Sequence, residues 1–217
     1  MAESEDEMRS ISWVIACAVS AGAASAQTVG LVEDFNGSSI GFGGGGFQGL
    51  VETGGVGGDG DGYMLIGRDI VANLGAYATS FTDIVGNFQE AGVTGVSFYL
   101  NELDVDDNLE IHVGVGNNFS NFWTTTIGFD PEAGTWTRYT VDFTDESQWT
   151  RIIGGGTFQN ALATADRLLF RHDLSPIERN PDPAQGFFGV DRITLLPAPS
   201  SVVLLASAGF FVTRRRR

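Results

Sequence analysis

The sequence predicts an all-β domain, a two-sheet β-sandwich of jelly-roll type, flanked by an N-terminal helix and a short C-terminal hydrophobic helix. Three observations predict the sandwich. Short runs of alternating or β-rich composition recur between residues 27 and 196, and glycine and Asn/Asp turns separate them. No amphipathic helix of any length lies among them. Many short strands within one domain are typical of a sandwich.

Nine segments are expected to be strands, because each is rich in β-branched or aromatic residues and ends at a turn signal. They are Val29–Phe35, Tyr63–Ile66, Tyr77–Thr82, Gly95–Leu100, Leu109–Val115, Phe122–Phe129, Thr135–Phe143, Arg167–Arg171 and Gly189–Leu196. Only Gln159–Ala165 is expected to form a helical turn. The glycine-rich stretch 41–49 lacks the Lys-Ser/Thr of a phosphate-binding loop, and we expect a flexible loop there.

The charge of the chain excludes some classes of partner. The chain has 27 acidic residues and 12 arginines, no lysine, and a formal charge of −15; four of the arginines are the last four residues. Residues 27–196 alone hold 23 acids and seven arginines, a charge near −16. Nucleic acids and anionic lipids need a basic surface, so neither is an expected partner. A single cysteine, Cys17, excludes an intramolecular disulfide and a Cys-based zinc site.

The N-terminal segment has the layout of a secretory signal. Met8-Arg9 precedes an apolar stretch that ends in Ala24-Ser25-Ala26. We therefore expect residues 1–26 to be a signal peptide that signal peptidase cuts between Ala26 and Gln27. The acidic residues 1–7 do not suit a signal, which suggests that translation begins at Met8. An alternative is a lipobox over residues 14–17, which would make Cys17 a lipidated N-terminus.

The C-terminal segment combines a motif, a short apolar helix and an arginine cluster. Pro197-Ala198-Pro199-Ser200 precedes the apolar run Val202–Val212, and Arg214–Arg217 end the chain. This order resembles the PEP-CTERM sorting tail of bacterial exported proteins, although Ala198 replaces the glutamate of the Pro-Glu-Pro motif. The resemblance implies an exosortase as partner, transient or retained membrane insertion of the helix, and delivery to the cell surface or exopolysaccharide matrix. A plain membrane anchor is the alternative, though the run is shorter than the ~20 residues of a full span.

Alternation along three expected strands places a set of polar and aromatic side chains on outward faces. In Leu109–Val115 the odd positions are apolar and should face the core, which leaves Glu110 and His112 outward. Six outward residues are expected to share one sheet face: Tyr99, Glu110, His112, Trp136, Arg138 and Arg171. Aromatic rings beside hydrogen-bonding groups are typical of sugar sites. The alternative is a solvated sheet face with Trp136 covered by a loop.

Three segments resemble those of galactose-binding-like domains and carbohydrate-binding modules: Glu33-Asp34-Phe35, residues 134–143 and residues 189–195. The resemblance implies a structural calcium ion between the first and last strands, and no organic cofactor. Glu33 and Asp191 are its expected ligands, since each carboxylate lies on an otherwise apolar face and must be paired or neutralised. An arginine partner, Arg68 or Arg192, is the alternative. Gly57–Gly62 could lend further carboxylates. The stretch 104–108 begins like an EF-hand loop, but we expect a turn between Leu100 and Leu109 instead.

The sequence shows no catalytic set. Its two histidines, His112 and His172, lack zinc-protease spacing and are expected at the surface. We therefore predict a non-catalytic, secreted component of an exopolysaccharide matrix, structural or sugar-binding. The alternatives are a jelly-roll glycan hydrolase or lyase, for which Glu110 and Asp142 are a possible carboxylate pair, and a purely scaffolding or adhesion protein.

Overall fold

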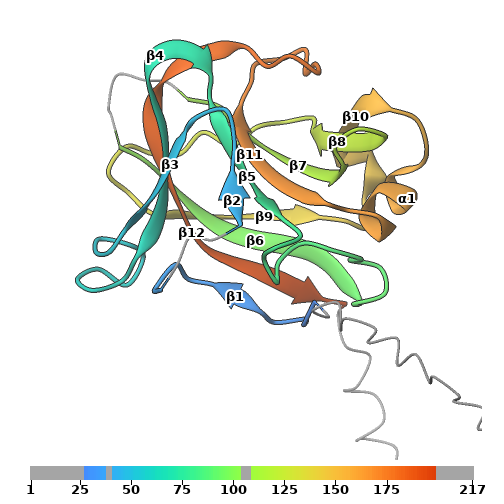
Figure 1. Cartoon of the computed structure of the whole chain (residues 1–217), viewed down its shortest axis with the longest axis horizontal. Coiled ribbons are helices and arrows are strands. Elements are labelled where there is room, and N and C mark those ends of the chain that lie inside the picture. Colours follow the sequence, from blue (N-terminus) through green and yellow to red (C-terminus); the bar gives the residue numbers. More distant parts are fainter. Residues whose placement is uncertain (1–26, 38–40, 104–108, 199–217) are drawn as a thin grey trace, which may run out of the picture.

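Two six-stranded antiparallel sheets face each other in the computed structural model, which describes residues 27–37, 41–103 and 109–198 (Figure 1). In sheet A the strand order is β3-β4-β12-β6-β9, and β1 pairs with the far end of β12. Its strands are β1 Val32–Glu33, β3 Phe47–Val51, β4 Tyr63–Asn73, β6 Val93–Glu102, β9 Thr137–Asp142 and β12 Pro183–Pro197.

Sheet B has the order β10-β8-β7-β11-β5-β2. Its strands are β2 Phe42–Gly43, β5 Gly75–Thr79, β7 Ile111–Asn117, β8 Asn121–Thr125, β10 Trp149–Gly154 and β11 Arg167–His172. A 3-10 turn, η1 Glu146–Gln148, precedes β10, and one short helix, α1 Phe158–Ala163, packs against β7 and β8. Thr157 caps this helix by accepting a hydrogen bond from the backbone N–H of Asn160.

The longest strand, β12, lies in the middle of sheet A. It is 15 residues long and pairs with β4 on one side and β6 on the other, and its last part pairs with β1 (Figure 1). The register with β6 shifts between Asp191 and Thr194, and Arg192 at this bulge has a left-handed φ of 46°. A bulge inserts one residue, so the residues on its two sides change the face to which they point.

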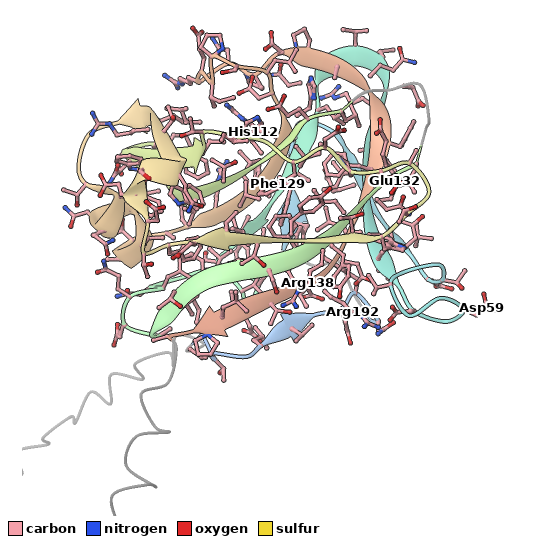
Figure 2. The ribbon with its side chains drawn as sticks, turned by 180° about the vertical axis from the view of Figure 1, so that it is seen from behind. Asp59, His112, Phe129, Glu132, Arg138 and Arg192 are labelled. Atoms are coloured by element: carbon pink, nitrogen blue, oxygen red, sulfur yellow. The ribbon has the colours of Figure 1, made fainter. Side chains whose placement is uncertain are left out.

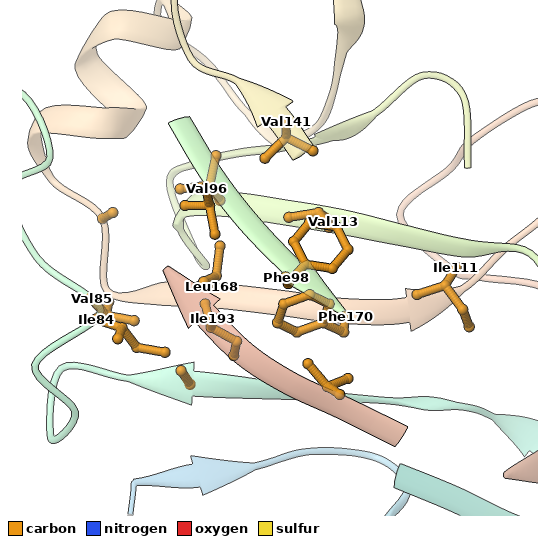
Figure 3. Packing of buried hydrophobic residues seen from close by; sticks show 14 of the residues in the cluster. Ile84, Val85, Val96, Phe98, Ile111, Val113, Val141, Leu168, Phe170 and Ile193 are labelled. Atoms are coloured by element: carbon orange, nitrogen blue, oxygen red, sulfur yellow. The ribbon is translucent and has the colours of Figure 1, made fainter. Parts of the chain in front are cut away.

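The core lies between the two sheets and is rich in phenylalanine. Phe98 of sheet A meets Phe170 of sheet B at a ring-centroid distance of 5.1 Å, and both rings are fully buried (Figure 3). Along β7 the alternation is as predicted: Ile111, Val113 and Val115 are fully buried on the core side. Each such side chain contributes about 1.5–3 kcal/mol when it leaves water.

The structure confirms the β-sandwich and adds three strands that the sequence did not indicate. These are β2, β3 and β10; the glycine-rich stretch 41–49 therefore contains β2 and the start of β3 instead of being only a loop. The helical turn expected at Gln159–Ala165 is α1. Residues 104–108 of the turn expected between Leu100 and Leu109, the signal segment and the apolar tail lie outside the described residues. Within the described part of the chain, no helix is long and apolar enough to cross a membrane.

Candidate functional site

The six residues expected on one sheet face are divided between two faces. Tyr99 and Arg138 are cross-strand partners on the outer face of sheet A, and Trp136 lies on the same side just before β9. Glu110 and His112 belong to the β7 segment, and Arg171 pairs with His112 on the outer face of sheet B. The expectation of one shared face is therefore wrong, because β7 and β11 pair in the second sheet.

A pocket of about 390 Å³ opens on the outer face of sheet A around Tyr99 and Arg138. Ser97 and Tyr99 come from β6, and Arg138 comes from the neighbouring β9, where its Nη2 donates to the Ser97 Oγ at 3.1 Å. Arg192 and Thr194 come from β12 and also line the pocket. Figure 2 shows Arg138 and Arg192 close together near β1, with His112 far from them.

The rim of the pocket is polar and comes from segments that the sequence analysis did not connect. Asp34 and Asn36 follow β1, and Asp61 belongs to the turn between β3 and β4. The Asp61 carboxylate accepts hydrogen bonds from the backbone N–H of Gly57 and from Asn36, and it pairs with Arg192 at 3.1 Å. These contacts, led by the Gly57 N–H, lower the pKa of Asp61.

Among the described residues Arg138 has no acidic partner, whereas Arg192 pairs with Asp61. Within the described residues no carboxylate lies within ion-pair distance of the exposed Arg138 guanidinium. Its only hydrogen-bond partner there is the Ser97 hydroxyl. A guanidinium has five N–H donors, so most of those of Arg138 are available to a ligand in the pocket.

Trp136 is half-buried and partly covered by a loop, as the alternative interpretation expected. Its indole N–H donates to the carbonyl oxygen of Gly54 at 2.9 Å, and its ring packs edge-to-face on Tyr63 with a centroid distance of 5.3 Å. Both rings lie over Gly189, where a Cβ atom would come within 2.6 Å of the indole. The ring is thus held in one orientation by contacts on three sides.

The candidate residues of sheet B are packed into the structure. His112 is fully buried: its Nδ1 lies 2.7 Å from the Thr125 carbonyl oxygen and its Nε2 lies 3.1 Å from Glu110 Oε1. His172 is also buried, and burial lowers its pKa; its Nδ1 accepts the backbone N–H of Glu110. The expectation that both histidines lie at the surface is therefore wrong. Both imidazole rings form hydrogen bonds with neighbouring polar groups inside the protein.

Arg171 is buried beneath the chain that follows β11. It forms an ion pair with Asp173, and its guanidinium donates to the carbonyl oxygens of Glu178 and Arg179. It is 5 % exposed and therefore has little surface to offer a ligand. Of the three sheet B candidates, Glu110 lines a second hollow of about 320 Å³, beside Ile127 and Leu174.

Glu33 and Asp191 do not form one calcium site, because they point to opposite sides of sheet A. Glu33 pairs with Ile193, a core residue, whereas Asp191 pairs with Tyr99 on the outer face. The bulge at Arg192 causes this difference, since it reverses the alternation on which the expectation depended.

Each of these two carboxylates has its own backbone donors. Glu33 accepts the N–H of Phe35 at 3.1 Å, and Asp191 accepts those of Val56 and Arg192 at 2.8 and 2.6 Å. Burial raises the pKa of both groups.

The alternative arginine partners bind elsewhere. Arg192 pairs with Asp61, and Arg68 donates to the carbonyl oxygen of Asn73. No cluster of three or more His, Cys, Asp or Glu suited to a metal ion exists in the described ranges.

The predicted processing sites lie at the two limits of the described chain. Gln27 is the first described residue, and Ala26 lies outside. Pro197 ends β12, where its carbonyl oxygen accepts the Thr94 hydroxyl at 2.9 Å, and Ala198 follows it. Pro199 and Ser200 lie outside the described residues. The predicted sorting motif therefore begins directly at the end of the central strand, with no linker.

Comparisons with known proteins find similarity in structure. No family model and no curated protein matches the sequence. The chain is similar to the family 11 carbohydrate-binding module of the cellulase Lic26A-Cel5E of Clostridium thermocellum, with 14 % identity, a TM-score of 0.51, and coverage of 79 % of this chain and 96 % of that one. The same module in complex with a β-1,3-1,4-mixed-linked tetrasaccharide gives 15 % identity, a TM-score of 0.50, and coverage of 79 % and 98 %.

An exo-β-agarase is a further structural neighbour, with 10 % identity and a TM-score of 0.53. The match covers 80 % of this chain and 25 % of the agarase. Identities this low show shared architecture only. The described domain is thus a β-sandwich with the fold of carbohydrate-binding modules.

Proposed function

We propose that the domain is a non-catalytic carbohydrate-binding module whose sugar site is the pocket on sheet A. The observation that carries this proposal is the pairing of Tyr99 with Arg138 in a concave site, where Arg138 has free N–H donors. An aromatic ring can stack on the apolar face of a pyranose, while Arg138, Asp34 and Asn36 read its hydroxyls. The fold shared with modules that bind polysaccharides supports this role.

The electrostatics of the pocket favour binding over hydrolysis. A glycosidase needs one carboxyl group that stays protonated, which requires a raised pKa. Asp61 is the most enclosed carboxylate of the pocket, and its hydrogen bonds lower its pKa. It is therefore suited to accept hydrogen bonds as a fixed anion.

Binding is tested by calorimetry of the full chain with soluble polysaccharides. Tyr99→Ala and Arg138→Ala are each expected to weaken binding about tenfold or more, because a central aromatic or arginine anchor contributes on the order of 2 kcal/mol. Tyr77→Ala and Arg151→Ala are matched controls on sheet B and should bind as the wild type does. Loss of binding in the controls, with none at Tyr99 or Arg138, would move the site to sheet B and reject this proposal.

We further propose that the protein is exported and sorted to the cell surface or to an extracellular polysaccharide matrix. The support is the sequence of both ends: a signal-like segment, and the motif, apolar helix and arginine cluster of the tail. We expect a mature chain that begins at Gln27 and has lost its arginine cluster. Intact mass measurement of the protein from its native host checks this, and a chain that retains both ends would contradict it.

A further inference from the structure

One region of the outer face of sheet A is apolar on three adjacent strands, and the buried Asp191 of β12 borders it. The register aligns Phe47, Gly67 and Phe187 in one row across β3, β4 and β12, and Gly49, Leu65 and Gly189 in the next. Val51 and Tyr63 follow in a third row. None of these outward positions is charged, although the outer face of an antiparallel sandwich is normally polar. Burial in the core does not explain why these outward positions are apolar, so another role is required.

Three glycines allow aromatic rings to lie over the strands. A Cβ atom on Gly67 would come within 2.0 Å of the Phe187 ring, one on Gly49 within 2.9 Å of the Phe47 ring, and one on Gly189 within 2.6 Å of the Trp136 ring. Side chains of a sheet usually stand roughly perpendicular to it. Each of these rings instead lies over a glycine, in the space that a side chain at that position would fill. The result is a shallow apolar surface.

We call this surface the aromatic strip; it consists of Phe47, Tyr63, Leu65, Trp136 and Phe187. Phe47 at one end is 60 % exposed, and the other four are half-buried. Trp136 connects the strip to the sugar pocket, since it precedes Arg138 by two residues on the same face. From β3 to β9 the sheet spans four strand spacings, or roughly 19 Å. The combined surface is thus longer than a single sugar ring.

We propose that the aromatic strip continues the sugar site, and that the ligand is an extended stretch of a linear, neutral polysaccharide that crosses the strands of sheet A. This inference rests on the proposed function. Low aromatic and aliphatic surfaces suit the apolar faces of successive sugar rings. The strip has no charge to pair with an acidic sugar, and the chain's net charge of −15 repels polyanions.

A series of oligosaccharides of increasing length tests this inference. We expect the full chain to bind linear neutral glucan, xylan and agarose fragments with an affinity that rises from disaccharide to tetrasaccharide or beyond, for at least one series. Phe47→Ala should weaken hexasaccharide binding roughly tenfold and leave disaccharide binding unchanged. Phe81→Ala is the matched control, because Phe81 is 86 % exposed and lies after β5 in the other sheet.

A second variant moves a ring without removing one. Gly67→Ala should displace the Phe187 ring, because the added Cβ atom would come within 2.0 Å of it, and should reproduce the length-dependent loss. A matching circular dichroism spectrum and melting temperature confirm that each variant is folded.

The outcomes separate the two proposals. No binding to any glycan would overturn the proposed function. Binding with full affinity at the disaccharide, or unaffected by Phe47→Ala and Gly67→Ala, would overturn the strip and leave the pocket. Preference for polyanions such as alginate would overturn the neutral class. A dimer that Phe47→Ala dissociates, with glycan binding intact, would assign the strip to a second copy of the chain.

Discussion

Replacing Asp173 with alanine is expected to lower the free energy of unfolding by about 3–5 kcal/mol, because the change strands the buried charge of Arg171. The two side chains form an ion pair, and the residues Asp173 and Arg171 are 1 % and 5 % exposed. Burial already lowers the pKa of Arg171, and Asp173 is the anion that offsets this effect. Asp173 also accepts the backbone N–H groups of Leu174 and Asp182, both at 3.1 Å, so the segment after β11 should loosen as well.

Chemical denaturation of the full chain measures this loss. The double variant Arg171→Met with Asp173→Leu is the informative control, since an apolar pair of similar volume often replaces a buried ion pair at little cost. We expect it to be more stable than Asp173→Ala alone. If Asp173→Ala changes the midpoint no more than an exposed substitution such as Glu146→Ala, the pair does not contribute as described.

Phe98→Ala is expected to remove about 3–5 kcal/mol, the usual cost of deleting a large aromatic side chain from a core. Phe98 is fully buried on β6 and contacts Phe170 of sheet B at 5.1 Å and Phe129 at 5.4 Å. Its loss therefore leaves a cavity where the two sheets meet. Phe81→Ala, which removes the same ring from an 86 % exposed position, should change stability by no more than about 0.5 kcal/mol.

Thermal and chemical melts of both variants test this contrast. Equal losses for Phe98→Ala and Phe81→Ala would mean that the Phe98 contacts do not hold the sheets together. If Phe98→Ala is less stable but still binds glycan under conditions in which it is folded, the core contacts and the sugar site are independent.

Local alternation predicted faces well but could not predict sheet membership. Ile111, Val113 and Val115 face the core as expected, and Tyr99 and Arg138 face outward as expected. Membership depends on pairing between residues far apart in the chain, such as Arg171 with His112. Local patterns therefore cannot show that the six candidate residues occupy two faces.

Single-residue irregularities account for the error at the expected calcium site. A period of two assumes an unbroken strand, and the left-handed Arg192 breaks β12. Asp191 consequently points away from the core, where the hairpin backbone at Val56 binds it. Nothing in the sequence around Arg192 marks the bulge, because a non-glycine residue is uncommon in this conformation.

The sequence of the aromatic strip has a pattern that fits two different structures. In Phe47–Val51 and Tyr63–Gly67 both alternate sets are apolar or glycine except for Gln48, a pattern equally typical of a strand buried on both sides. Only the register shows that Gly67 lies between Phe47 and Phe187, and that Gly49 and Gly189 lie on either side of Leu65. The outward position of Phe47, 60 % exposed, then distinguishes a surface from a core.

The central place of β12 in sheet A has a consequence for synthesis. β12 begins at Pro183, so a growing chain that stops before this residue leaves one edge of β4 and one edge of β6 unpaired. Unpaired strand edges favour aggregation, and pairing between distant segments is slow. We therefore expect the domain to stay unfolded on the ribosome until nearly all of it has been made. An unfolded chain is also the form that a narrow export channel can thread.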